Sequence, residues 1–148
     1  MRVSIQRADT IVRAHQPAIR EAALGPLLRR SGDALRLPAR ASLAVRLTDD
    51  GELRQLNLRF LAVDAPTDVL AFPAGETGRV GDVAISVERA VAQAAGGDGA
   101  AELRLLAVHG LLHCVGHDHA AAADAALMTA ATRSLLPDQP VPDLVARR

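Results

Sequence analysis

Apolar and polar residues alternate along several short stretches of the chain, and this period of two is typical of β-strands with one buried face. Leu43, Val45 and Leu47, for example, are separated by Ala44 and Arg46. The predicted strands cover residues 3–7, 42–47, 68–73 and 80–86. Four strands of this length are enough for one sheet of ordinary size.

Between and after these strands, apolar residues recur at the helical period of about 3.6 residues. The predicted helices cover residues 17–23, 50–60, 87–95, 102–115 and 121–136. Gly25 and Pro26 interrupt the first of them, so that it either kinks or is followed by a second short helix over residues 26–30. Residues 48–50 and Ser86 are suitable N-caps for the helices that follow them.

The helix predicted over residues 102–115 has apolar residues nearly all the way round, which is typical of a helix buried on most sides. A glycine-rich turn is predicted at residues 75–78, between the third and fourth strands. The last residues, 137–148, contain three prolines and are predicted to form a mobile tail. The order of elements predicts one mixed domain of helices and strands over residues 1–148.

The composition agrees with one soluble globular domain, because hydrophobic residues make up 49% and charged residues 23% of the 148 positions. A single cysteine excludes an intramolecular disulfide framework, as expected in a reducing compartment. No apolar run is long enough to cross a bilayer, and residues 1–7 alternate like a strand rather than a signal peptide. We therefore expect a cytoplasmic protein without a membrane partner.

The charge balance gives no support for nucleic-acid binding, because 17 basic and 17 acidic residues leave a formal net charge of zero. DNA is not an expected partner. The chain has no lysine, so every basic side chain is arginine, which is suited to phosphate contacts and to stacking on bases. The absence of lysine, tyrosine and tryptophan is better explained by a genome rich in G and C than by a function.

Four of the five histidines lie between positions 109 and 119, and their spacing indicates a metal site. His109 and His113 are four residues apart, so both rings leave the same face of a helix. Gly116 permits the helix to end and the chain to turn back, which brings His119 toward the first two. Three imidazole ligands and one open position are typical of a catalytic zinc site, whereas a structural zinc site has four protein ligands.

The histidine spacing matches the zinc-protease signature H-E-x-x-H-x-x-G-x-x-H at every position except the glutamate. In those proteases the glutamate takes the proton from zinc-bound water. Gly110 stands in its place here and can take no proton. The sequence therefore predicts a zincin-like metal helix that binds one Zn²⁺ per chain but lacks the protease base.

The neighbours of the three predicted ligands have other expected roles. His117 is two residues before His119, so an extended loop points it to the opposite side, toward solvent or a supporting position. Asp118 either orients a ligand imidazole or faces water. Cys114 points about 100° away from His113 on the helix and is expected to be a small buried residue. The fifth histidine, His15, is interpreted as an ordinary surface or hydrogen-bonded core residue.

Three blocks of the chain resemble the YbeY family of bacterial metal-dependent endoribonucleases. Residues 109–119 resemble the family's H-G-x-L-H-L-x-G-Y-D-H, residues 66–73 its P-T-D-V-L-S-F-P, and residues 81–86 its G-D-I-x-I-S. Leu56 and Asn57 precede them in the family's order. The resemblance implies an α+β fold, zinc held by the residues matching His109, His113 and His119, and single-stranded RNA as substrate. It also implies contact with the small ribosomal subunit, 16S rRNA 3′-end maturation and ribosome quality control.

The chain departs from the family pattern in the loop after the Leu-Asn helix. Leu61 stands where the family has an arginine, and Val63 and Ala65 stand where it has lysines. Arg59 is two residues earlier than that arginine, roughly 200° round a helix. The sequence therefore identifies no catalytic side chain beside the metal-bound water, and Arg59 is the only candidate near the expected phosphate contact.

Three functions are compatible with these residues. The leading hypothesis is metal-dependent cleavage of an RNA phosphodiester, where the substrate's own 2′-hydroxyl makes a glutamate base less necessary. A zinc-dependent peptidase or amidase is favoured by the histidine spacing and opposed by Gly110. A non-catalytic ribosome assembly factor with a structural metal is favoured by Leu61.

Overall fold

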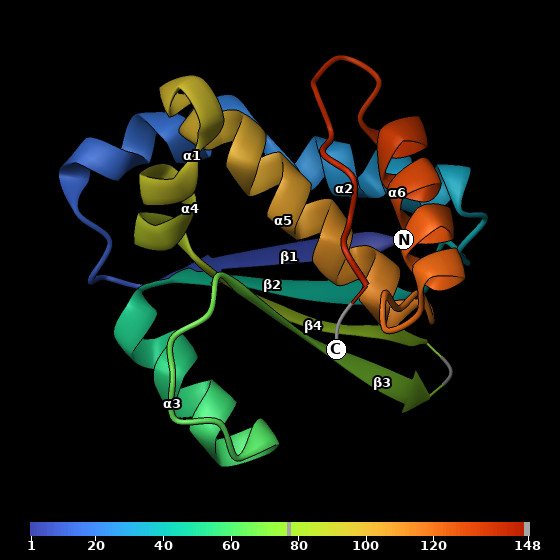
Figure 1. Cartoon of the computed structure of the whole chain (residues 1–148), viewed down its shortest axis with the longest axis horizontal. Helices are drawn as coiled ribbons and strands as arrows, with labels where there is room; N and C mark the ends of the chain where they lie inside the picture. Colours follow the sequence, from blue (N-terminus) through green and yellow to red (C-terminus); the bar gives the residue numbers. More distant parts are fainter. Residues whose placement is uncertain (77, 147–148) are drawn as a thin grey trace.

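A mixed four-stranded sheet organises the chain (Figure 1), and the computed structural model describes residues 1–76 and 78–146. Its strands are β1 (Arg2–Arg7), β2 (Ser42–Thr48), β3 (Val69–Glu76) and β4 (Arg79–Ser86), in the order β1-β2-β4-β3. The first three in this order are parallel, and β3 pairs antiparallel with β4 at the edge. The predicted number of strands is confirmed, but β3 continues past its predicted end at Pro73 to Glu76, because a proline is tolerated in an edge strand. The glycine-rich turn predicted at 75–78 includes Thr77, which lies outside the described residues.

Helices cover both faces of the sheet, but unequally. They are α1 (Gln16–Ala22), α2 (Leu24–Ala34), α3 (Asp50–Leu61), α4 (Val87–Gln93), α5 (Gly99–Cys114) and α6 (Ala122–Leu135), with short 3-10 turns η1 (Arg13–His15) and η2 (Ala95–Gly97). Figure 1 shows α3 alone on one side of the sheet and the other helices on the opposite side. Among the described residues, no helix combines the length and apolar character needed to cross a bilayer. The architecture is a single α+β domain, as expected.

The alternating residues of β4 join two hydrophobic clusters on opposite faces of the sheet. Val83 belongs to the main cluster, which contains most of the buried residues of α5 and β2. Its neighbour Ala84 belongs to a smaller cluster with Leu53 of α3 and Leu70 of β3. This arrangement follows from the period of two in a strand, because successive side chains point to opposite faces.

Helix α5 is the most enclosed element, as its apolar residues predict. Leu103, Val108, Leu111 and Leu112 have no exposed surface. The helix begins at Gly99, three residues before the predicted start, because the Asp98 side chain accepts a hydrogen bond from the backbone N–H of Ala101 (3.0 Å) and caps it. A helix held on most sides is a rigid mount for the side chains it carries.

The break in the N-terminal helical region differs from the prediction. It lies at Ala23, which adopts a left-handed conformation (φ 48°), and not at Gly25 and Pro26. Pro26 is in the first turn of α2, where a missing backbone donor costs nothing. Helix α2 then continues to Ala34, well beyond the predicted end at residue 30. Ser31 and Gly32 have low helix propensity, but both are buried by tertiary packing, which the local sequence does not show.

Residues 137–146 follow α6 without forming a helix or strand and run back along α5 (Figure 1). The side-chain amide of Gln139 donates to the carbonyl of Ala101 in α5 (2.9 Å). Residues 147 and 148 of the predicted tail lie outside the described residues. The mobility of this tail stays a prediction, and its contacts near the histidines are described below.

Candidate metal centre

The structure brings together the three histidines that the sequence selects. His109 and His113 leave the same face of α5, with their Nε2 atoms 3.1 Å apart. The His119 ring lies beside them, with centroid distances of 5.4 Å to His109 and 5.5 Å to His113. One ring nitrogen from each residue lies within 4.8 Å of the other two. Tetrahedral zinc at about 2.0–2.1 Å from each nitrogen needs ligand atoms roughly 3.4 Å apart, so the group can hold a metal ion after small side-chain adjustments.

The chain reversal that delivers His119 depends on Gly116. This glycine has a positive φ of 102°, the conformation that ends a helix in a Schellman motif. The N–H of His117 donates to the carbonyl of Leu112 (2.9 Å), and the N–H of Gly116 donates to that of His113 (3.1 Å), as this motif requires. The predicted glycine-permitted turn is confirmed.

The residues flanking His119 are placed by backbone contacts. The Asp118 carboxylate accepts a hydrogen bond from the backbone N–H of His119 (2.8 Å), which fixes the main chain at the third histidine. His117 is half-buried and is not in the three-histidine group. The fifth histidine, His15, lies in η1 and is also outside this group.

Gly110, in the place of the protease glutamate, is a packing residue. A Cβ atom at this position would lie 2.6 Å from Cγ1 of Val83 in β4, closer than real Cβ atoms approach, and 3.0 Å from its Cγ2, which is a tight contact. Helix α5 therefore rests directly on the sheet at the residue after its first histidine. The structure leaves no room there for a catalytic carboxylate, which is the physical reason for the departure from the protease signature.

The three histidines open onto a cavity of about 600 Å³. Its walls come from α5, from β3 and the loop before it, from the end of α3, from α6 and from the segment after α6; the lining residues include Leu61, Thr67, Asp68, Val69, Ala71, Glu102, Leu105, Thr132, Val141, Pro142 and Leu144. Apart from the three histidines, none of the described lining residues is basic. The three histidines are therefore the main candidates in this lining for binding a cation.

Arg59 and Leu61 are placed differently with respect to this cavity. Leu61 lines it, so the position of the family arginine does face the site. Arg59 is exposed and is not among the lining residues; its guanidinium carbon lies 5.2 Å from the ring centroid of Phe60. The structure thus does not bring Arg59 to the histidines, and its predicted role stays a prediction.

Two carboxylates that the sequence pattern did not single out, Asp68 and Glu102, also line the cavity. Gln93 of α4 donates hydrogen bonds to both Asp68 (2.9 Å) and Glu102 (3.1 Å). Burial raises the pKa of the Glu102 carboxyl, the hydrogen bond from Gln93 opposes this rise, and the charge of Asp68 adds to it. The seven-residue spacing from His109, two turns along one face of α5, is the signal in the sequence that points to Glu102.

We expect Glu102→Gln to stabilise the protein at pH 7 by a small amount. A carboxyl whose pKa is raised on folding is harder to ionise in the folded state than in the unfolded chain. It therefore lowers the free energy of unfolding once the pH rises above its pKa in the unfolded chain, and this loss is complete above its pKa in the folded protein. The melting temperature of the variant should exceed that of the wild type at pH 7, and the difference should vanish near pH 3.5. Glu21→Gln, at an exposed position, is the control. An advantage that persists at pH 3.5 would exclude this explanation.

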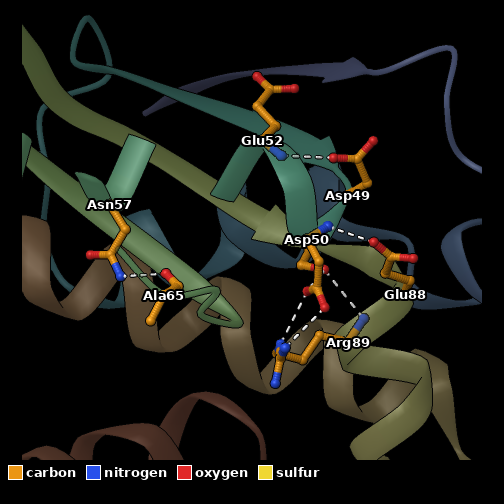
Figure 2. A network of polar contacts seen from close by, with 8 residues as sticks. Asp49, Asp50, Glu52, Asn57, Ala65, Glu88 and Arg89 are labelled. Carbon is orange, nitrogen blue, oxygen red and sulfur yellow. Dashed lines mark hydrogen bonds and ion pairs between the residues drawn. The ribbon is translucent and has the colours of Figure 1, made fainter. Parts of the chain in front are cut away.

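A polar network fixes α3 and the loop that leads to the cavity (Figure 2). Asp50 in the first turn of α3 binds the Arg89 guanidinium (2.9 and 3.0 Å) and accepts a hydrogen bond from the Ser86 hydroxyl (2.7 Å). Farther along α3, the amide of Asn57 donates to the carbonyl of Ala65 (2.9 Å) and holds the loop that enters β3. Asn57, part of the Leu-Asn element of the resemblance, therefore has a structural role here.

Cys114, the only cysteine, packs against the sheet. A Cβ atom at Gly81 of β4 would lie 2.7 Å from its sulfur, and the three-histidine group does not include it. Burial raises the pKa of the Cys114 thiol to about 11, the Asp82 charge adds to this rise, and a hydrogen bond that the sulfur accepts from the backbone of Phe72 opposes it. The predicted packing role is confirmed, although Cys114 is half-buried and not fully enclosed as expected.

We expect the folded protein to react slowly with thiol reagents. With a pKa of about 11, the thiolate fraction at pH 8 is about one in a thousand, and the thiolate is the reactive form. A disulfide exchange reagent should label Cys114 much more slowly in buffer than in guanidinium chloride, where one thiol per chain should react. Equal rates under the two conditions would contradict the burial described here.

The fold and the site together define a class: an α+β domain whose most enclosed helix carries a three-histidine group able to hold a metal ion above a cavity. Within that class, the chain belongs to the endoribonuclease YbeY family, whose sequence model matches residues 8–139. The resemblance found in the sequence is thereby confirmed.

Several relatives share much of the sequence. A protein of Chloroflexus aggregans named endoribonuclease YbeY is 42% identical over 114 residues, which cover 68% of this chain and 74% of the relative. A protein of the same name from Moorella thermoacetica is 39% identical over 128 residues, which cover 76% and 82%. The fold is similar to the solution structure of a Thermotoga maritima protein, with 21% identity, a TM-score of 0.51 and coverage of 92% of this chain and 90% of that one.

Proposed function

We propose that this protein is a zinc-dependent endoribonuclease that cleaves single-stranded RNA in the cytoplasm. We further propose that it acts with the small ribosomal subunit in 16S rRNA 3′-end maturation and ribosome quality control. The observation that carries the first proposal is the convergence of His109, His113 and His119 at a cavity in a chain of the endoribonuclease YbeY family.

The donor set fits zinc, because three imidazoles are the ligands of many catalytic zinc sites and leave one coordination position open. Zinc bound there supplies Lewis acidity to a phosphate oxygen and lowers the pKa of a water to about 7. The chain itself contributes His109 and His113 on the rigid helix α5 and His119 on the loop that follows. It also contributes a cavity with both polar and apolar walls, which orients the substrate. RNA provides a nucleophile in its 2′-hydroxyl, so the absence of a base at Gly110 is compatible with this reaction.

A direct assay distinguishes the nuclease from the peptidase alternative. The zinc-loaded protein is incubated with a single-stranded oligoribonucleotide, with the DNA oligonucleotide of the same sequence, and with denatured casein, each with and without chelator. We expect cleavage of the RNA alone and its loss with chelator. Chelator-sensitive proteolysis without RNA cleavage would contradict the proposal, and the packing of Gly110 against Val83 argues against that outcome.

The assembly-factor alternative is favoured by Leu61, since the lining described here contains no arginine. It predicts that the protein sediments with small ribosomal subunits while the zinc-loaded form cleaves no RNA above background. Co-sedimentation combined with the cleavage assay separates this alternative from the proposed enzyme.

We expect Leu61→Arg to strengthen RNA binding. Leu61 is 57% exposed at the cavity, so an arginine there can reach a substrate phosphate without being buried. One added phosphate contact should raise the affinity for RNA about two- to tenfold at moderate salt. It should also release about one more counterion on binding, so that the affinity falls more steeply with salt concentration. Leu58→Arg is a matched control, because Leu58 is 51% exposed on the same helix but does not line the cavity. An equal gain in both variants would indicate a general charge effect.

A further inference from the structure

Residues 141–146, called the strap here, are fastened to α6 by several hydrogen bonds. The guanidinium of Arg133 donates to the carbonyl of Val141 (3.0 and 3.3 Å) and pairs with the carboxylate of Asp143 (2.7 Å). The hydroxyl oxygen of Thr129, which is buried in α6, accepts a hydrogen bond from the backbone N–H of Leu144 (3.0 Å). These contacts hold the backbone of the strap in a defined path across α5 (Figure 1).

Apolar side chains of the strap complete one wall of the cavity. Val141 and Leu144 are half-buried and pack against the main hydrophobic cluster. Together with Pro142 they line the cavity on which the three histidines open. The strap is therefore part of the site's surroundings, although all of it lies beyond residues 8–139, the part of the chain that the family model matches.

The strap also contacts one of the three histidines. The Nδ1 atom of His119 lies 3.2 Å from the backbone carbonyl oxygen of Val145. A carbonyl oxygen only accepts hydrogen bonds, so this contact favours the tautomer with the proton on Nδ1 and leaves Nε2 unprotonated, ready to bind a metal. His109 and His113 are oriented by the rigid helix α5, whereas His119 lies on a loop and gains most from such a partner.

We propose that the strap is a positioning element of the metal site: the Val145 carbonyl holds His119 in the tautomer and orientation that bind the metal, and the anchors on α6 hold that carbonyl in place. This inference rests on the proposed metal role of the three histidines. Partners that orient a metal ligand in this way typically change metal affinity by about ten- to a hundredfold when they are removed.

The test compares four forms of the protein: the full chain, a chain that ends after Asp143 and lacks Val145, a control chain that ends after Ala146, and Arg133→Gln at full length. Zinc affinity is measured by competition with a chromophoric chelator. We expect the chain ending at Asp143 to bind zinc about ten- to a hundredfold more weakly and Arg133→Gln to show a smaller loss. The control chain should match the full chain.

Two spectroscopic readouts separate positioning from general stability. The visible absorption of bound Co²⁺ reports the coordination geometry, and ¹⁵N chemical shifts of the apo protein report which nitrogen of His119 carries the proton. We expect both to change in the chain ending at Asp143 and to stay unchanged in the control chain. Arg133→Gln keeps the test decisive if the shortened chain does not fold.

The outcomes for the strap and for the metal site are distinguishable. If all four forms bind zinc with the same affinity and give the same Co²⁺ spectrum, the strap has no positioning role and the proposed metal site stands. If the full chain binds zinc no better than His113→Ala, the proposed metal site itself is wrong, and the role of the strap is rejected with it.

Discussion

His113→Ala is expected to abolish zinc-dependent RNA cleavage and to weaken zinc binding by more than about a hundredfold. The substitution leaves two of the three nitrogens that converge at the cavity, and a pair of imidazoles cannot hold the ion in the same geometry. Equilibrium dialysis with elemental analysis measures the bound zinc, and the oligoribonucleotide assay measures cleavage. The two readouts should fall together, because the proposed chemistry depends on the bound ion.

His117→Ala is the matched control for this substitution. It removes an imidazole from the same loop but not from the three-histidine group, so zinc content and cleavage should be close to those of the wild type. Full cleavage by His113→Ala would contradict the proposed function. Loss of zinc and of thermal stability in His113→Ala, with no cleavage by either protein, would instead support the structural metal of the assembly-factor alternative.

Gly110→Ala is expected to lower the free energy of unfolding by about 1–2 kcal/mol. Alanine is favoured over glycine inside a helix by about 1 kcal/mol, but overpacking against a well-filled core costs about 1–3 kcal/mol. The added methyl would lie 2.6 and 3.0 Å from atoms of Val83, so we expect an overpacking cost near the upper end of this range. Chemical denaturation followed by circular dichroism measures the difference.

Two further variants show whether the contact with Val83 is the cause. In a Val83→Ala background, the cost of Gly110→Ala should shrink or change sign, since the space occupied by the two Cγ atoms is released. Gly51→Ala in α3 is the control, because its added methyl meets no atom closer than 3.4 Å. Gly110→Glu, which restores the protease signature, should prevent stable folding and not create a peptidase. A stable, proteolytic Gly110→Glu variant would overturn this account.

The sequence predicted the features of the site that depend on local chain geometry. Two histidines four residues apart share a helix face whatever surrounds them, and a glycine three residues later permits the reversal that brings His119 back. The alternation in the strands and the N-caps Asp49 and Ser86 are local in the same sense, and all of them were found where expected. Local periodicity was therefore enough for the strands, for most of the helices and for the convergence of the three histidines.

The features that the sequence did not reveal depend on contacts between distant residues. The role of Gly110 requires knowing that Val83, on a strand 27 residues earlier, lies directly beneath it. The contact between His119 and Val145 joins a loop to a segment that is rich in prolines and has no helical or strand periodicity in the sequence. The break at Ala23 was missed because a left-handed alanine is tolerated only when the surrounding packing compensates for it.

The unequal mounting of the three histidines has a consequence for how the ion enters and leaves. Amides of α5 around His109 and His113 are expected to exchange with deuterium only when the whole domain opens, since this helix is enclosed by the core. The loop that carries His119 has far fewer apolar contacts and should exchange through local opening at much lower energy. We therefore expect local opening of the loop that carries His119 to set the rates of zinc binding and release, because His109 and His113 stay fixed on α5.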